Sequence, residues 1–168
     1  MCPDSGGKCK LTQGSDPDII KDRIRAGGNG SGEGVHTMKR VLLKLSGEAL
    51  AGDKKTGFDE ATCLEVAGQV KKLVDQGIQI AIVTGGGNFW RGRTSETIDR
   101  VKADQIGMLA TVMNCIYVSE IFRYAGMDTE VFTPFTCGAF TTLFSKDAAV
   151  KALETGKVIF FAGGTGHP

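Results

Sequence analysis

The sequence predicts an α/β fold with a mainly parallel central sheet, and three observations lead to that prediction. Residues 78–83 form an apolar run rich in β-branched side chains, closed on either side by Gly77 and Gly85. Such a short run is typical of a strand buried on both faces. Further runs of this kind recur at 41–45, 128–133 and 158–162. Segments with helical spacing lie between them, at 59–76, 101–124 and 146–154. This alternation predicts parallel strands joined by right-handed crossovers.

Capping and turn residues set the expected limits of these elements. Asp59 is a good N-cap for the first long helix, and Gly77 is typical of the position after a helix C-terminus. The helix at 101–124 is apolar on more than one face, which predicts either a central position or contact with a partner. Residues 51–57 and 134–145 lack a periodic pattern, so we expect a polar loop and an irregular connection there.

Composition and charge exclude several classes of protein. The 168 residues are 41% hydrophobic and 23% charged, which is ordinary for one globular domain. A net charge of +1 favours neither a nucleic-acid partner nor a membrane surface. No apolar run approaches the roughly 20 residues that span a bilayer, and no secretory signal opens the chain. We therefore expect a cytoplasmic protein.

The cysteines and histidines do not predict a metal site. The five cysteines are odd in number and include no CxxC pair, which argues against a disulfide framework or a zinc site. Cys63 and Cys115 lie in helical apolar stretches and are expected in the core. The two histidines, His36 and His167, are far apart in sequence, and no metal ligand is predicted among the protein's residues.

The chain divides near Met38. Residues 1–37 hold eight of the 24 glycines and no aromatic residue, so they are expected to be a disordered extension or a tag. Residues 38–168 carry the periodic pattern. Because the chain stops in a glycine loop directly after a strand, we expect 38–168 to be the first part of a longer domain.

Three strand ends carry the candidate functional residues. Lys44 precedes Ser46-Gly47, three glycines follow the strand at 78–83, and Gly163-Gly164-Thr165-Gly166 follows the strand at 158–162. The carboxyl ends of parallel strands meet at one edge of the sheet, where α/β proteins bind ligands. Glycines let backbone N–H groups approach a phosphate, and the fork of Arg91 suits one. The alternatives are a plain turn for the glycines and a water-facing edge position for Lys44.

Asp104 is open to two interpretations. It lies near the start of the helix at 101–124, where the helix dipole favours a carboxylate. It also lies about 20 residues after the glycine loop, the spacing of a ribose-binding acid in a dinucleotide-binding fold.

Residues 39–168 resemble the amino-acid kinase superfamily, and within it the bacterial uridylate (UMP) kinases. The segments that carry the resemblance are 41–50, Gly85 to Gly92 and Asp104 to Asn114. The resemblance implies a carbamate kinase-like αβα sandwich with a mainly parallel central sheet, of which this chain holds the N-terminal, phosphate-acceptor half. It also implies an enzyme that transfers the γ-phosphoryl group of MgATP to UMP, giving UDP, and an assembly into hexamers.

The same resemblance implies a role for particular residues. Lys44 is implied as the catalytic contact to the transferring phosphoryl group. The implied ATP- and phosphate-binding residues are Lys44, Leu45, Ser46, Gly47, Gly87 and Arg91. The implied UMP-binding residues are Gly86, Arg91, Asp104, Thr165, Gly166, His167 and Pro168. His167 departs from the asparagine usual in the family. The adenine site and a further catalytic aspartate lie in the family's second half, so the chain alone is expected to be inactive.

Several readings compete with this one. A kinase of the same fold that phosphorylates a carboxylate is the nearest, and a non-catalytic nucleotide-binding or assembly module is the alternative from another class. A Rossmann dehydrogenase is disfavoured because the glycines are contiguous. The apolar helix is the expected dimer contact, with Val112 and Met113 as positions where a charge would break assembly.

Overall fold

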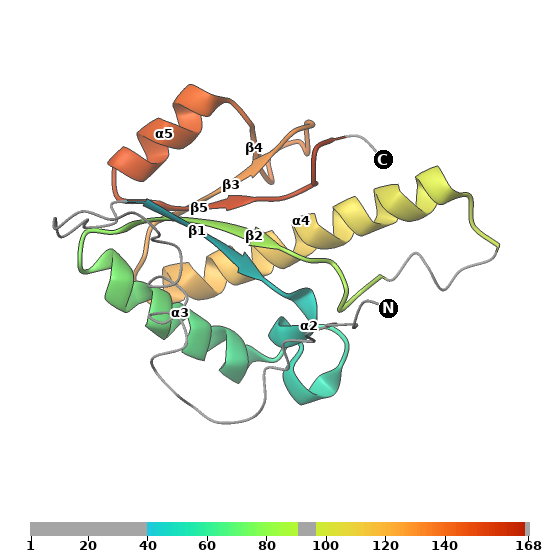
Figure 1. Cartoon of the computed structure of the whole chain (residues 1–168), viewed down its shortest axis with the longest axis horizontal. Helices are drawn as coiled ribbons and strands as arrows, with labels where there is room; N and C mark the ends of the chain where they lie inside the picture. The colour runs from blue at the N-terminus through green and yellow to red at the C-terminus, as the bar shows by residue number, and fades with distance from the viewer. Residues whose placement is uncertain (1–39, 91–96, 167–168) are drawn as a thin grey trace, which may run out of the picture. The chain divides into compact units, whose positions relative to one another are not determined.

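The computed structural model describes residues 40–90 and 97–166 (Figure 1). The predictions for 1–37, Arg91, His167 and Pro168 concern residues outside these two ranges. Five strands form one sheet, and every neighbouring pair is parallel. In sheet order they are β1 (Arg40–Leu45), β2 (Gln79–Thr84), β5 (Val158–Phe161), β3 (Thr129–Thr133) and β4 (Thr142–Leu143). The predicted α/β fold with a parallel sheet is confirmed.

Helices cover both faces of the sheet, giving three layers. Two long helices lie on one face and a shorter helix lies on the other (Figure 1). The helices are α2 (Gly47–Leu50), α3 (Glu60–Val74), α4 (Arg100–Tyr124) and α5 (Lys146–Glu154), with a 3₁₀ turn at Gly52–Lys54. α4 contacts β3, β2 and β5, whereas α5 contacts β5 and β2. The central strands β2, β5 and β3 are therefore mostly buried, whereas the edge strands β1 and β4 carry exposed residues.

The first crossover forms as its capping residues predict. The Asp59 carboxylate accepts a hydrogen bond from the Thr62 N–H at 3.3 Å, which caps α3. After α3, Gly77 adopts φ +78°, a conformation that glycine reaches without strain. β2 then runs beside β1 with Lys44 opposite Val83.

The core has one cluster on each face of the sheet. Toward α4, the rings of Phe122 and Phe160 meet edge to face with centroids 5.4 Å apart. Toward α5, buried side chains of the sheet and the helix form a second cluster: Ala81, Phe132, Ala149, Ala152, Leu153 and Ile159.

The two cysteines expected in the core are there. Cys63 and Cys115 are fully buried, and burial raises the pKa of each thiol to about 11. Both thiols therefore stay protonated at neutral pH, and neither is a nucleophile.

Three short elements were not expected from the sequence. α2 directly precedes the predicted polar loop, the 3₁₀ turn lies inside that loop, and β4 lies inside the segment predicted to be irregular. β4 has only two residues, paired as Thr142 with Phe132 and Leu143 with Thr133. So short a strand is specified by its partner strand rather than by its own pattern.

The expectation that no segment is long and apolar enough to cross a membrane is wrong for α4. By length and composition alone α4 passes that test, since no charged residue occurs from Gln105 to Ser119. Ala110, Cys115 and Val118 are nevertheless buried, and the helix contacts three strands. α4 is the core helix of the domain.

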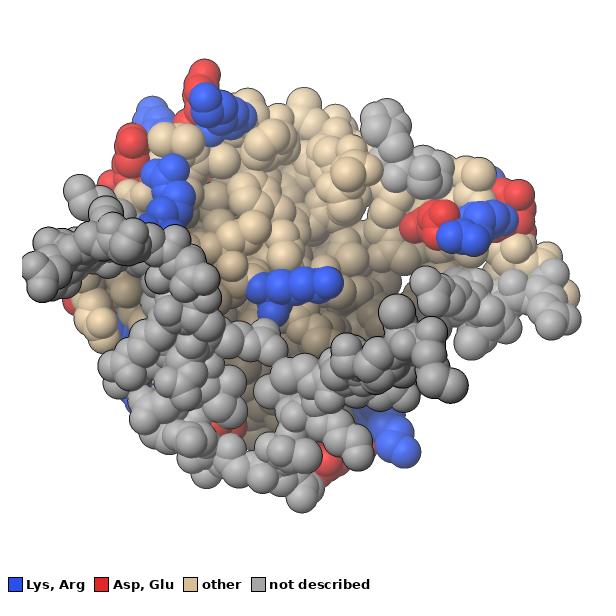
Figure 2. All heavy atoms as spheres, viewed as in Figure 1, with Lys and Arg blue, Asp and Glu red and all other residues tan. Residues whose placement is uncertain are grey.

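On the face seen in Figure 2, basic and acidic side chains are interspersed.

Candidate functional site at the carboxyl edge of the sheet

The carboxyl ends of β1, β2 and β5 lie at the same edge of the sheet. Leu45 is opposite Thr84, and Val83 is opposite Phe161. The three segments that follow are 46–47, 85–88 and 162–166. The structure thus brings together the three glycine-bearing strand ends that the sequence singled out.

The loops after β1 and β2 touch at Gly47. The Gly85 N–H donates to the Leu45 carbonyl oxygen at 3.0 Å. A Cβ placed on Gly47 would lie only 2.5 Å from the Gly85 carbonyl oxygen and 2.6 Å from Oδ1 of Asn88. No larger residue fits at position 47 without parting the two loops.

Within the triple glycine, space rather than backbone conformation requires glycine, most clearly at Gly86. Positive φ angles do not occur at Gly85, Gly86 or Gly87, so the left-handed conformation is not what these positions need. Space is the requirement: a Cβ on Gly86 would lie 2.9 Å from the Ala110 Cβ and 3.0 Å from the Gly107 carbonyl oxygen. The loop therefore rests directly on α4.

The glycine loop after β5 does require the left-handed conformation. Gly163, Gly164 and Gly166 have φ values of +79°, +60° and +83°. The loop lies against Pro134 and Phe135, because a Cβ on Gly163 would be 2.7 Å from the Phe135 ring. The N–H of Gly163 donates to Oγ1 of Thr111 at 2.8 Å. This loop too is fastened to α4.

One face of α4 lies along both loops. Asp104, Gly107, Thr111 and Asn114 are spaced three, four and three residues apart, which places them on one side of a helix. Gly107 meets the triple-glycine loop and Thr111 holds the loop after β5. Asp104 is one turn farther toward the N-terminus, with its side chain 42% exposed and 3.4 Å from Nε of Arg100.

Two charged side chains lie beside the loops. Lys44, the penultimate residue of β1, is exposed and makes no hydrogen bond or ion pair with the other described residues. Glu48 lies over the triple glycine, since a Cβ on Gly87 would be 3.1 Å from its Oε1. Among residues 40–90 and 97–166, no group of three His, Cys, Asp or Glu is placed to hold a metal ion.

A buried amide pair was missed by the sequence analysis. Asn88 and Asn114 are 1% and 0% exposed. Nδ2 of Asn88 donates to Oδ1 of Asn114 at 3.0 Å, and Nδ2 of Asn114 donates back to Oδ1 of Asn88 at 2.8 Å. The remaining amide hydrogens reach the carbonyl oxygens of Gly57 at 2.8 Å and Gly85 at 2.6 Å. An asparagine inside the most apolar stretch of the chain was the available signal, because such an amide needs a buried partner.

The remaining predicted ligand residues are only partly described. Thr165 is exposed and Gly166 half-buried at the end of the loop after β5. Arg91, His167 and Pro168 lie outside the described residues. They adjoin Trp90 and Gly166, which end the described part of their loops.

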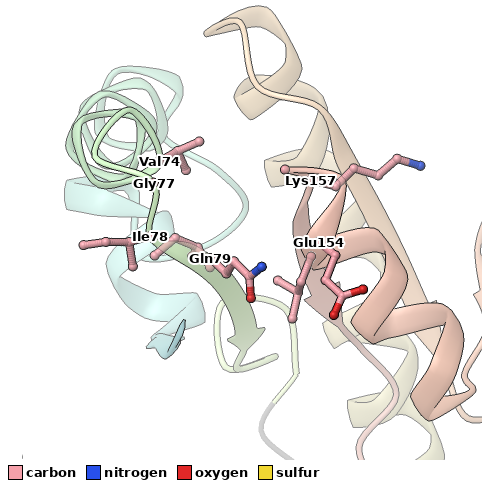
Figure 3. Close-up of a pocket in the computed structure, with 9 residues that line it drawn as sticks. Val74, Gly77, Ile78, Gln79, Glu154 and Lys157 are labelled. Atoms are coloured by element: carbon pink, nitrogen blue, oxygen red, sulfur yellow. The ribbon is translucent and has the colours of Figure 1, made fainter. Parts of the chain in front are cut away.

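A cavity of about 160 Å³ lies at the opposite edge of the sheet. It is bounded by the C-terminal ends of α3 and α5, the first residues of β2, and the two residues Gly156 and Lys157 before β5 (Figure 3). The polar ends of Gln79 and Glu154 are turned toward it, whereas Lys157 points away and pairs with Glu130 at 2.9 Å. None of the predicted site residues lines it, so the cavity is separate from the candidate site.

The comparisons with known proteins agree with this architecture. The sequence model described as the amino acid kinase family matches residues 39–168. The UMP kinase of Bacillus anthracis is a similar solved structure, with 37% identity, a TM-score of 0.73 and coverage of 77% of this chain and 55% of that one. The UMP kinase of Ureaplasma parvum has 30% identity and a TM-score of 0.73, with coverage of 78% and 58%. The chain thus spans little more than half the length of these two structures, and it belongs to the amino acid kinase family.

Proposed function

We propose that this chain carries the phosphate-acceptor side of a UMP kinase, which transfers the γ-phosphoryl group of MgATP to UMP and releases UDP. The proposal rests on one observation: the triple-glycine loop packs against the face of α4 that also bears Asp104. A phosphate held at the loop then has its sugar within reach of a carboxylate. The similarity to two UMP kinases at 37% and 30% identity supports this choice of acceptor.

The loops after β1 and β2 fit the transfer step. Phosphoryl transfer depends mainly on positioning and on neutralising charge that spreads over the phosphoryl oxygens. Lys44 supplies a positive charge at the sheet edge where the loops that bear Gly47 and Gly87 lie side by side. In this proposal Lys44 contacts the transferring group, while the backbone from Leu45 to Gly47 and Gly87 lies beside the ATP phosphates.

Mg²⁺ fits this site as a partner of ATP rather than as a resident ion. Mg²⁺ in kinase sites is commonly held by one or two carboxylates together with the phosphates. The Glu48 carboxylate beside Gly87 is a described acidic group in position to contribute. When bound, the ion would neutralise phosphate charge during transfer.

We assign the acceptor to the triple-glycine loop and the segments next to it in sequence and structure. We assign the UMP phosphate to Arg91 and Gly86, and the ribose hydroxyls to Asp104. The remaining UMP contacts are assigned to the loop after β5, at Thr165, Gly166, His167 and Pro168. Thr111 and Pro134 contact the start of this loop. An imidazole at 167 retains a hydrogen-bond donor where the family usually has an asparagine amide.

We also propose a cytoplasmic homo-oligomer, hexameric for the whole protein, that pairs through α4. The α4 apolar row comprises Ile106, Leu109, Met113 and Ile116, of which Leu109 and Met113 are 54% and 47% exposed. The row is flanked by Lys102 and Glu120, and its positions are symmetric about residue 111. Two antiparallel copies would therefore place Leu109 against Met113 and Lys102 against Glu120.

A panel of phosphate acceptors tests the proposed function. The whole protein is incubated with MgATP and UMP, CMP, N-acetylglutamate, aspartate or glutamate, and ADP release is measured. UMP should be preferred over the three carboxylates by at least about tenfold in kcat/KM, as a bound phosphate and ribose provide contacts that an amino-acid carboxylate lacks. CMP, which has the same phosphate and ribose, measures how far the base is recognised. Preference for a carboxylate would replace this proposal with the related kinases. Binding of UMP without any transfer would identify a non-catalytic module.

A further inference from the structure

We infer that Asn88 and Asn114 are positioning residues, which set the spacing of the two phosphate loops for the proposed phosphoryl transfer. Neither side chain is placed to touch a nucleotide, since both are at least 99% buried. The identity of the ligand rests on the proposed function, whereas the positioning role rests on the geometry of the amide pair.

The pair joins four separate segments of the chain. Asn114 comes from α4 and Asn88 from the loop after β2, and each donates to the other. Their second donors hold Gly85 of the same loop and Gly57 from the turn before α3. Gly47, after β1, lies so close that a Cβ there would be 2.6 Å from Oδ1 of Asn88 and 3.1 Å from Nδ2 of Asn114.

The chemistry of the pair makes the spacing rigid. All four amide hydrogens are used, at distances between 2.6 and 3.0 Å. A buried amide that loses its partner leaves another polar group unsatisfied, at considerable cost. Movement of the loop after β2 away from α4 would break these bonds, and Gly47 lies packed against both amides. The pair therefore holds Gly47 and Gly85 at a fixed separation, and with them Lys44 and Gly87.

A positioning role differs from a contact role in what it predicts. Substitution of a residue that contacts only UMP changes the affinity for UMP alone. This pair, in contrast, fixes loops assigned to both the donor and the acceptor phosphates. Since both residues belong to one pair, removing the second after the first should have little further effect.

The test uses Asn114→Ala, Asn88→Ala and the double variant of the full chain. The matched control is Thr129→Val at the opposite edge of the sheet. Thr129 is 5% exposed, and its Oγ1 accepts from Nε of Arg123 at 2.8 Å, so this variant also loses a buried hydrogen bond. UMP binding is followed by fluorescence of Trp90, the single tryptophan, beside Gly107 of α4.

Each single variant should weaken UMP binding by about tenfold or more, because it removes buried hydrogen bonds that hold the loop after β2 on α4. The double variant should bind within about threefold of the weaker single, and Thr129→Val within about twofold of the unaltered chain. UMP affinity that is unchanged in Asn114→Ala, or reduced equally in Thr129→Val, would overturn the inference.

Amide hydrogen exchange tests the inference without any nucleotide. Asn114→Ala should speed exchange about tenfold or more at 46–51 and 84–90, and leave β3 and β5 unchanged, because opening is local. Uniform acceleration over the whole domain would mean that the pair only stabilises the fold, and overturns its positioning role. If the unaltered chain binds no UMP, the proposed function fails, and the exchange pattern still decides whether the pair sets the loop spacing.

Discussion

Thr111 and Gly163 are 52 residues apart in sequence, yet Oγ1 of Thr111 accepts the Gly163 N–H at 2.8 Å. The same hydroxyl donates to the Met108 carbonyl oxygen at 2.7 Å. The loop after β5 is thereby fixed to the helix that also supports the triple glycine.

Thr111→Val should loosen that loop with little change of shape. Valine keeps the branched side chain but leaves the Gly163 N–H without its acceptor, which costs about 1–3 kcal/mol for a buried donor. We expect lower thermal stability and weaker UMP binding, with ATP affinity unchanged. Calorimetry with each nucleotide measures this. Thr155→Val is the control, because its hydroxyl bonds only within the last turn of α5. Equal losses of stability and of UMP affinity in both variants would mean that the hydrogen bond from Gly163 to Thr111 does not support UMP binding.

Gly86→Ala and Gly68→Ala should change stability in opposite directions. A methyl group at 86 would meet Ala110 at 2.9 Å, and crowding of this kind costs about 1–3 kcal/mol. Gly68 lies exposed inside α3 with nothing within 4 Å of the added Cβ, so alanine should stabilise by about 0.5–1 kcal/mol. Urea unfolding of the two variants gives both values. A stable Gly86→Ala variant would show that α4 does not limit the loop.

Met113→Glu should dissociate the proposed oligomer without unfolding the chain. Met113 is 47% exposed in the centre of the α4 apolar row, and paired copies would bury the new charge without a partner. Light scattering gives the mass and circular dichroism monitors the fold. Val112, the other position suggested by the sequence, is wrong for this purpose. It is 6% exposed, so Val112→Asp places a charge in the core. An unchanged mass for Met113→Glu would remove α4 as the contact.

Lys44→Ala should lower kcat of the whole protein by about 10² or more, since it removes a charge placed for the transition state. Its stability should stay within about 0.5 kcal/mol of the original, because Lys44 is exposed and contacts no described charge. Lys72→Ala, an exposed lysine of α3, is the control in the same assay. A kcat equal to that of Lys72→Ala would end the catalytic assignment of Lys44.

The sequence was sufficient for the fold because its signals are local. β-branched runs such as 78–83 and capping residues such as Asp59 each specify their element within a few residues. α5 occupies the residues expected, whereas the two-residue β4 depends on pairing with β3 and could not be foreseen.

The site was predictable only in part. The motif at 85–87 located the loop, but the space that requires glycine at position 86 is set by Ala110 and Gly107, residues more than 20 positions away. The amide pair likewise depends on packing between α4 and the loop after β2. Long-range contacts of this kind leave no periodic trace in a single sequence.

The interpretation of Asp104 decides between a nucleotide site and an ordinary helix start. As an ion-pair partner of Arg100, with side chains 83% and 42% exposed, it would contribute little, about 0.3–0.5 kcal/mol. As the ribose ligand it should contribute about 1.5–3 kcal/mol to UMP binding. Arg91, which we assign to the phosphate, should contribute about 2–5 kcal/mol.

A UMP titration of the whole protein carrying Asp104→Asn, Arg91→Ala or Arg100→Ala, with ATP titrated in parallel, tests where the acceptor binds. Asp104→Asn and Arg91→Ala should weaken UMP by at least about tenfold and leave ATP unchanged, because both residues are assigned to the acceptor. Arg100→Ala breaks the ion pair but keeps the carboxylate, so its UMP affinity should stay within about twofold of the original. If Asp104→Asn binds UMP as well as Arg100→Ala does, or if Arg91→Ala weakens ATP as much as UMP, the acceptor site is not where we place it.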